Sequence, residues 1–294
     1  MKIINIGSMN LDHVYQMDHI VLPGETESSE KMEIFLGGKG MNQSIALAKA
    51  GAEVYQGGLI GQDGDCFLEA CRKYGVHGDY IRKAPGATGH AIIQVDRNAQ
   101  NSILLYGGAN QKLTEAYVDE VLSHFGKGDL LLLQNEINLL PYIVERAYEK
   151  GLEIALNPSP FNEKILALDL NKIGIFLLNE VEGEQLTGEK EPKKIIAAFR
   201  KKLPEAKIVL TLGKNGAVYA DREHEYFQDI FKVRAVDTTA AGDTFTGYFL
   251  AGYAAGEPVQ ETLKISARAS SIAVTRQGAV PSIPPREEVL AALA

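Results

Sequence analysis

Short apolar runs alternate with amphipathic stretches along most of the chain. The runs are bounded by glycine or polar residues, as expected for buried strands, at 2–7, 53–61, 128–134, 152–158, 173–179 and 206–213. The stretches with helical patterning lie at 40–50, 63–75, 138–151, 192–203, 240–256 and 259–278. This alternation predicts an α/β fold with a doubly wound, mainly parallel sheet and helices on both faces. Ligands bind such sheets beyond the carboxyl ends of the strands.

Two segments interrupt the alternation. Residues 12–35 have mixed polarity without a helical period, and residues 90–106 hold two strand-like runs joined by the polar turn 97–100. We expect these segments to form a small sheet that stands apart from the main body. Residues 216–228 are typical of a hairpin. Without an internal repeat or a low-complexity linker, residues 1–294 are predicted to be a single domain with two insertions.

Composition narrows the function classes. The net charge of -8 argues against a nucleic-acid partner, which usually requires a basic surface. Cys66 and Cys71 are the only cysteines, so we expect a reducing compartment rather than a disulfide framework. No apolar run is long enough for a signal peptide or a membrane span. These features predict a cytoplasmic protein without a membrane partner.

The segment VDTTAAGDTFTG at 236–247 carries the strongest chemical signal. Ala241 and Gly242 leave the backbone accessible at the expected start of a helix, where free N–H groups and the helix dipole favour an anion. Asp243 lies in the first turn of that helix. The segment is therefore interpreted as an anion site with an adjacent carboxylate, and the alternative is that Asp243 only caps the helix.

Four further motifs combine polar side chains with glycines. LGGKGMNQS at 36–44 forms a glycine-rich entry to a helix, with a glycine-rich turn as the alternative. Asn10 and Asp12 follow the first strand and suit sugar hydroxyls or a turn. Asn179 and Glu182 have the spacing of a capping box. TLGKNGA at 211–217 ends a strand, and a hairpin turn explains it equally well.

Several other chemistries are excluded by what the motifs lack. Lys39 is followed by glycine rather than serine or threonine, so the segment is not a Walker phosphate loop. Neither a dinucleotide fingerprint nor a paired-histidine metal motif occurs. Ser8 lacks the glycine pattern of a hydrolase nucleophile.

Together the motifs resemble the ribokinase branch of the phosphofructokinase-B-type sugar kinases. One family signature runs from Gly37 through Asn42 to Gly61, and the other covers residues 237–247. NLD, NPSP, NEVE, TLGKNGA and AVTRQGAVPS fall in the family's order, so the resemblance spans nearly the whole chain. It implies an ATP-dependent kinase with a small lid sheet that often forms a dimer interface.

The resemblance also implies a role for each matching residue. Asp243 would take the proton from the sugar hydroxyl, and the N–H groups of Ala241, Gly242 and Asp243 would bind the γ-phosphate. The residues implied to hold the sugar are Asn10, Asp12, Gly38, Lys39, Asn42, Glu136 and Asp243. Those implied at ATP and Mg²⁺ are Asn179, Glu182, Thr211, Gly213, Gly216 and Gly242. A monovalent cation, K⁺, is implied at the carbonyls of Asp237, Thr239, Ala273, Arg276 and Gly278, with Ser282.

The expected reaction is phosphorylation of the terminal hydroxyl of a small sugar, with D-ribose giving ribose 5-phosphate. The alternatives are a fructokinase, a deoxyribokinase or a nucleoside kinase, and in another class a sugar-binding regulator. An intact Asp243 argues against the regulator, which needs no base. Ala267 departs from relatives that carry a polar residue or histidine against the adenine, which leaves base selectivity open.

Overall fold

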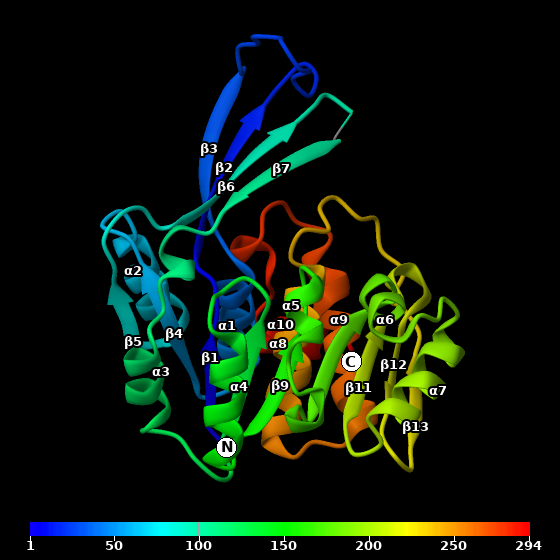
Figure 1. The fold of residues 1–294 in the computed structure, drawn as a ribbon. Helices are drawn as coiled ribbons and strands as arrows, with labels where there is room; N and C mark the ends of the chain where they lie inside the picture. Colours follow the sequence, from blue (N-terminus) through cyan, green and yellow to red (C-terminus); the bar gives the residue numbers. More distant parts are fainter. Residues whose placement is uncertain (99) are drawn as a thin grey trace.

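A large mixed sheet forms the body of the molecule. The computed structural model describes residues 1–98 and 100–294, and over these residues the strands of the large sheet follow the order β13-β12-β11-β10-β9-β8-β1-β4-β5 (Figure 1). Neighbours from β11 to β5 are parallel, whereas β12 and β13 are antiparallel. This arrangement confirms the predicted doubly wound α/β fold and the predicted hairpin.

The strands of the large sheet are β1 (Ile3–Ile6), β4 (Val54–Ile60), β5 (His77–Lys83), β8 (Leu130–Gln134), β9 (Glu153–Asn157), β10 (Ile175–Asn179), β11 (Lys207–Thr211), β12 (Ala217–Ala220) and β13 (Glu225–Gln228). The helices are α1 (Lys39–Lys49), α2 (Asp65–Tyr74), α3 (Glu115–Leu122), α4 (Leu140–Glu149), α5 (Glu163–Leu166), α6 (Glu180–Thr187), α7 (Pro192–Lys202), α8 (Ala241–Ala255), α9 (Val259–Ala273) and α10 (Arg286–Ala291).

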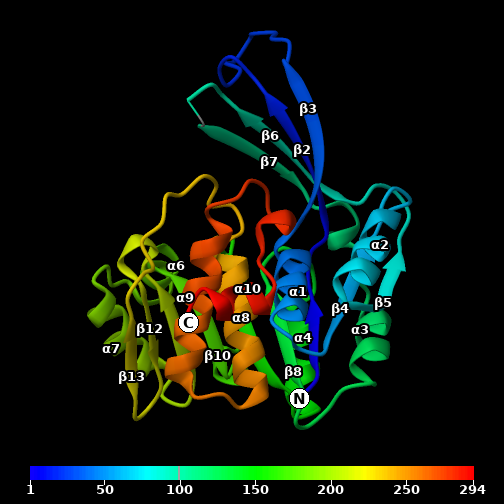
Figure 2. The same ribbon diagram turned by 180° about the vertical axis from the view of Figure 1, so that it is seen from behind.

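The parallel strands are buried on both faces, so they consist of continuous apolar residues rather than alternating ones. Successive residues point to opposite faces, and Ile3 joins one core while Ile4 joins the other. One core packs α3, α4, α6 and α7 on the sheet, and the other packs α1, α2, α8, α9 and α10. Figure 2 shows this second layer from its own side, with α8 packed against both α1 and α9.

The small sheet projects from the carboxyl end of the large one (Figure 1). It contains β2 (Asn10–Gln16), β3 (Lys31–Gly37), β6 (Gly89–Val95) and β7 (Asn101–Tyr106), in the order β3-β2-β6-β7. Its central pair β2–β6 is parallel and its outer pairs are antiparallel. The predicted turn 97–100 includes residue 99, which lies outside the described residues.

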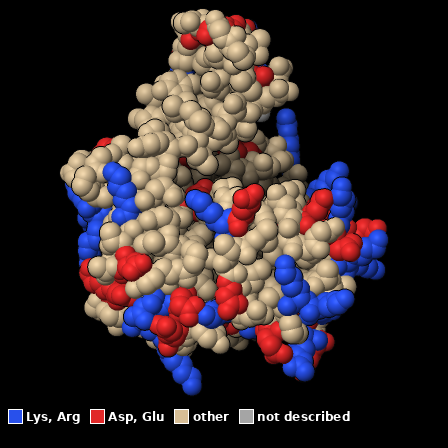
Figure 3. Space-filling model, in the orientation of Figure 1, with Lys and Arg blue, Asp and Glu red and all other residues tan. Residues whose placement is uncertain are grey.

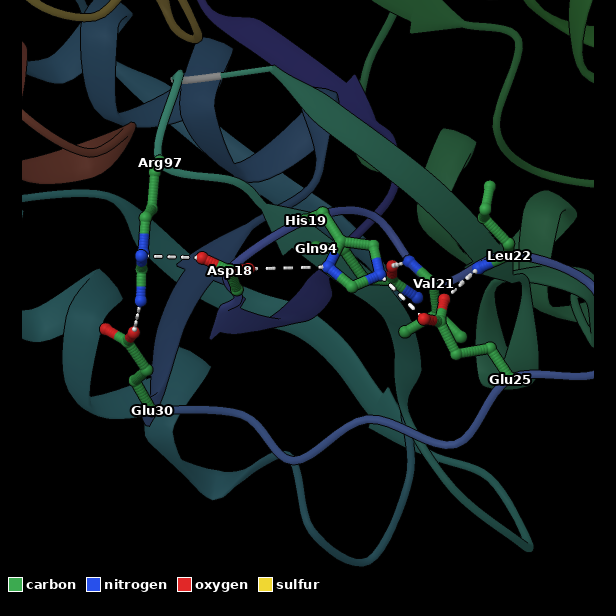
Figure 4. A network of polar contacts seen from close by, with 8 residues as sticks. All are labelled: Asp18, His19, Val21, Leu22, Glu25, Glu30, Gln94 and Arg97. Carbon is green, nitrogen blue, oxygen red and sulfur yellow. Dashed lines mark hydrogen bonds and ion pairs between the residues drawn. The ribbon is translucent and has the colours of Figure 1, made fainter.

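Polar contacts tie the two strand pairs together at the tip of the small sheet (Figure 4). Arg97 beyond β6 pairs with Asp18 at 2.7 Å and with Glu30 at 2.9 Å, at the two ends of the β2–β3 connection. Gln94 on β6 accepts a hydrogen bond from the Val21 N–H at 3.0 Å. The exposed ion pairs add little free energy, but they link both connections into one unit.

One local expectation needs correction, and one strand was not predicted. Asn10 and Asp12 lie inside β2 rather than in a loop, because only residues 7–9 separate the end of β1 from the start of β2. Residues 77–83, which have no clear period, form the edge strand β5 by pairing in parallel with β4. Within the described residues, no helix is long and apolar enough to cross a membrane.

Candidate active site

Asp243 lies at the start of α8, and its carboxylate points to α1 rather than to its own helix. The N-cap of α8 is Ala240, which makes no side-chain capping bond. Asn42 donates from Nδ2 to Asp243 Oδ2 at 2.9 Å, and Gln43 donates from Nε2 to Asp243 Oδ1 at 2.8 Å. The side chain is only 5% exposed. The interpretation of Asp243 as a simple helix cap is therefore wrong.

Glycines allow α1 to approach its neighbours closely enough for these bonds. A Cβ on Gly247 of α8 would lie 2.4 Å from the Cβ of Ala46 on α1. A Cβ on Gly40 would lie 2.4 Å from the backbone of Gly7 at the end of β1. A larger side chain at Gly247 would separate the helix that carries Asn42 from the one that carries Asp243, and one at Gly40 would push α1 away from β1.

Three carboxylates and one ammonium group meet beneath the small sheet. Burial, reinforced by the charges of Glu136 and Asp243, raises the pKa of Asp12 to about 7. Burial, with Asp243 adding to it, raises the pKa of Glu136, although bonds from Ser8 and from the Lys39 N–H oppose the shift. For Lys39, burial favours the neutral form, but the charges of Asp243, Glu136 and Glu182 outweigh it and raise the pKa.

The predicted sugar-binding residues come together at this place. Asp12 lies against Gly37, where a Cβ would fall 2.0 Å from its Oδ2. Gly38 begins α1 with φ +87, and a Cβ there would fall 2.8 Å from the Asn10 nitrogen. Asn42 keeps its Oδ1 buried, and among the described residues this oxygen has no hydrogen-bond partner. A free buried acceptor beside Asp243 suits a ligand hydroxyl.

A cavity of about 570 Å³ opens on the other side of Gly242. It is lined by residues from 211–217, 230–235, 238–245 and 267–274, together with Asn179. Ala267 lies in this lining, and the guanidinium of Arg268 stacks 5.1 Å from the ring centroid of Phe231 in the wall. Cavities of this size accept small organic ligands.

A smaller cavity of about 70 Å³ lies beside the large one. Asn179, Thr211 and Gly242 line both cavities, whereas Lys39, Glu182 and Asp243 line the smaller one. A Cβ on Gly242 would have nothing within 4 Å, so it would project into open space. The two cavities are therefore neighbours that share part of their walls, and Asp243 lines the smaller one.

Two motifs form the predicted local structure and also line the cavities. Asn179 and Glu182 form the complete capping box of α6, with both bonds at 2.9 Å, and they also line the smaller cavity. Residues 211–217 make the turn between the antiparallel strands β11 and β12, while Gly213 and Gly216 line the large cavity. The same residues therefore stabilise a helix start or a turn and also form part of a cavity wall.

The segments predicted to bind a monovalent cation lie side by side. The Val236 N–H donates to the Val274 carbonyl at 2.7 Å, and the Gly278 N–H donates to Asp237 Oδ2 at 2.9 Å. Ser282, by contrast, directs its hydroxyl to the Ala279 carbonyl at 2.7 Å. Among the residues that the structure describes, no group of three His, Cys, Asp or Glu side chains forms a ready metal site.

Sequence reasoning missed the residues that support the site from behind. Asn110 donates to Asn10 Oδ1 at 2.8 Å and also bonds the backbone of Met9, which fixes the start of β2. Gln43 and Gln134 lie behind Asp243. Gln43 adjoins Asn42 in the glycine-rich motif, which was the only available signal. Asn110 and Gln134 stand in segments without any motif.

Comparison with known proteins finds carbohydrate kinases over nearly the whole chain. A family model described as pfkB family carbohydrate kinase matches residues 1–286. The ribokinase of Haemophilus influenzae is 35% identical over 97% of this chain and 96% of its own length. The deoxyribokinase of Salmonella typhi is 32% identical over 98% of this chain and 97% of its own length. The structure of Arabidopsis thaliana ribokinase complexed with ribose and ATP superposes with a TM-score of 0.87 at 31% identity, covering 99% of this chain and 98% of that one.

Proposed function

The chain belongs to the pfkB family of carbohydrate kinases, and we propose that it transfers the γ-phosphoryl group of ATP to the terminal hydroxyl of ribose, giving ribose 5-phosphate. One observation carries the proposal. The large cavity and the polar cluster beneath the small sheet meet at Gly242 and Asp243. A donor in the cavity and an acceptor in the cluster would bring their reacting groups together there.

Asp243 is proposed as the general base. Its two oxygens accept bonds from α1, which holds the carboxylate in one orientation at the meeting point of the cavities. It would remove the proton from the attacking hydroxyl. The N–H groups of Ala241, Gly242 and Asp243 are at the helix start and would stabilise the negative charge on the transferred group.

The sugar is proposed to lie between Asp243 and the small sheet. Asn42 Oδ1 offers an acceptor without a partner, and Asp12, Lys39 and Glu136 add charged groups. Asn10 and Gly38 complete the set of proposed contacts. Together these groups match several hydroxyls of a small polyol.

ATP is proposed to occupy the large cavity, with Thr211, Gly213 and Gly216 along it. Mg²⁺ accompanies ATP in phosphoryl transfer and neutralises charge on the phosphates. The residues fit an ion held largely by phosphates and water. Glu182 commits one oxygen to the capping box, and its other oxygen is available in the smaller cavity. Asn179 would act beside it.

A monovalent cation, K⁺, is proposed beside the anion site. The contact of Val236 with Val274 and of Asp237 with Gly278 brings the carbonyl-rich segments together. The proposed ligands are the carbonyls of Asp237, Thr239, Ala273, Arg276 and Gly278, with Ser282. Such an ion would fix the loop before α8 without entering the reaction.

The small sheet is proposed to act as a lid and to pair with a second copy. Ile34, His13, Ile92 and Leu104 stand in one cross-strand row, on the face opposite Asp12, and Ile34 and Leu104 are more than half exposed. Figure 3 shows few charged side chains on the visible face of this sheet below its tip. An apolar sheet face this exposed is a liability in a monomer, which supports a homodimer. A location in the cytoplasm stays a prediction.

A coupled assay of ADP release tests the proposed reaction. The panel holds ATP and Mg²⁺ with ribose, deoxyribose, fructose or a nucleoside, and phosphorus NMR identifies the product. We expect the highest kcat/KM with ribose and phosphate on its terminal oxygen. Faster turnover of deoxyribose, a hexose or a nucleoside would instead assign the chain to one of the alternative kinases.

A further inference from the structure

A chain of buried amide side chains leads from Asp243 into the centre of the large sheet. Gln43 donates to Asp243 at 2.8 Å, and Gln134 at the end of β8 donates from Nε2 to Gln43 Oε1 at 2.7 Å. The same nitrogen of Gln134 donates to Oδ1 of Asn5 on β1 at 3.0 Å. Gln43 and Asn5 are fully buried and Gln134 is 1% exposed, so water does not reach the chain.

The charge of Asp243 dictates how these amides are oriented. An ionised carboxylate only accepts hydrogen bonds, so Gln43 must present its NH₂ group to Asp243 and its carbonyl to Gln134. Gln134 must then direct its own NH₂ group to Gln43. Its Oε1 is left buried without a hydrogen-bond partner. Buried acceptors of this kind are rare and unfavourable, which points to a role beyond stability.

We propose that Gln43 and Gln134 are positioning residues that hold Asp243 ionised and correctly oriented for proton removal. The inference rests on the proposed role of Asp243 as the base. Neither glutamine belongs to the linings described above, so they would act through Asp243 rather than on a ligand.

The charges around Asp243 explain why such support is needed. Asp12 on β2 and Glu136 after β8 place two further carboxylates near it. Lys39 on α1 is the opposing positive charge, and Glu182 shares the smaller cavity. A buried carboxylate in this setting stays ionised more readily when amide donors bond to it. Gln134 strengthens the donor by polarising the Gln43 amide.

The test compares Gln43→Met with Gln56→Met at saturating ribose and ATP. Gln56 is also fully buried, but it bonds Ser44 and the backbone of Gly7 and Gly57. Losing a bond to an ionised group corresponds to about a 10- to 100-fold effect. We expect kcat of the Gln43 variant to fall by that factor, and the acid limb of its kcat profile to move up by about one pH unit. The KM for ribose should stay within about threefold.

The Gln56 variant should lose thermal stability while its pH profile stays in place. An unmoved acid limb in Gln43→Met, or an equal shift in both variants, would overturn the inference. Gln134→Met should move the limb in the same direction by a smaller amount, and it carries the test if the Gln43 variant does not fold.

A spectroscopic measurement separates this inference from the proposed function. In protein labelled with ¹⁵N-glutamine, the side-chain NH₂ signal of Gln43 should titrate with Asp243, and Gln134→Met should raise the midpoint. This holds even if the wild type phosphorylates none of the sugars, a result that refutes only the proposed function. If the titration midpoint of the Gln43 signal is the same in the wild type and in Gln134→Met, the positioning role is refuted.

Discussion

Asp243→Asn is the most informative substitution, because the proposed mechanism and a purely structural role predict different results. The variant keeps the shape of the side chain but cannot accept the proton of the sugar hydroxyl. General-base catalysis contributes ~10²–10⁴-fold to a rate. We therefore expect kcat for ribose to fall by that factor, while the KM for ribose changes much less.

The structure also sets the expected effect on stability. Asp243 accepts bonds from Asn42 and Gln43, and an asparagine would turn its NH₂ group toward one of these donors. Losing one bond to a charged group costs about 1.5–3 kcal/mol. Part of this loss is offset, because Asp12 and Glu136 no longer face a third carboxylate. A decrease in Tm of several degrees is expected, with the protein still folded.

Steady-state kinetics and thermal unfolding together distinguish a catalytic from a purely structural role of Asp243. Asp65→Asn is the matched control, because Asp65 also lies in the first turn of a helix, α2, where it pairs with Lys83 on the surface. The control should keep kcat within about twofold. A folded Asp243→Asn protein that retains more than about a tenth of the wild-type kcat would refute the catalytic role.

Four further predictions address the neighbouring features. Gly242→Ala should keep the Tm, since the added Cβ meets open space. It should nevertheless lower kcat/KM for ATP by about 10-fold or more, because the methyl group would stand between the backbone N–H groups and the γ-phosphate. Unchanged kinetics would show that the phosphate does not approach the backbone at Gly242. Asp12→Asn should raise the Tm more at pH 8 than at pH 4.5. Folding raises the pKa of Asp12 from 3.8 to about 7, so the wild type loses stability as the pH rises through this range, and asparagine removes that loss. An equal increase in Tm at both pH values would contradict the raised pKa of Asp12. Leu104→Glu should halve the mass measured by light scattering, from twice 32.0 kDa to one chain; a wild type of one chain mass would refute the dimer. Replacing K⁺ by an organic cation at equal ionic strength should lower kcat, and unchanged rates would remove the proposed cation site.

Much of the site could be predicted because its residues lie in compact motifs. Ala241, Gly242 and Asp243 are consecutive, and their place at a helix start follows from the local pattern. Lys39 and Asn42 likewise share one glycine-rich helix entry. Asn10 and Asp12 were found through the same short motif, although their strand conformation was not predicted. That conformation arises from pairing with β6, which is almost 80 residues away in the chain.

The residues that support the site could not be predicted, since each acts through a distant partner. Gln134 ends an apolar strand and appears in the sequence only as the polar residue that closes it. Its role depends on Gln43, 91 positions earlier, and on the charge of Asp243. Phe231 lies in an irregular segment without periodicity, yet its ring forms part of the cavity wall.

The sequence by itself determined the order of elements, the two-faced burial of the parallel strands and the glycine-containing start of α8. These features depend on interactions between near neighbours, such as apolar periodicity, glycine conformations and unpaired N–H groups at a helix start. Only the tertiary structure decided that Asp243 faces α1, that three carboxylates share one buried space, and that a row of amides stands behind them. Burial and electrostatic coupling are properties of groups brought together by folding, so no local pattern encodes them.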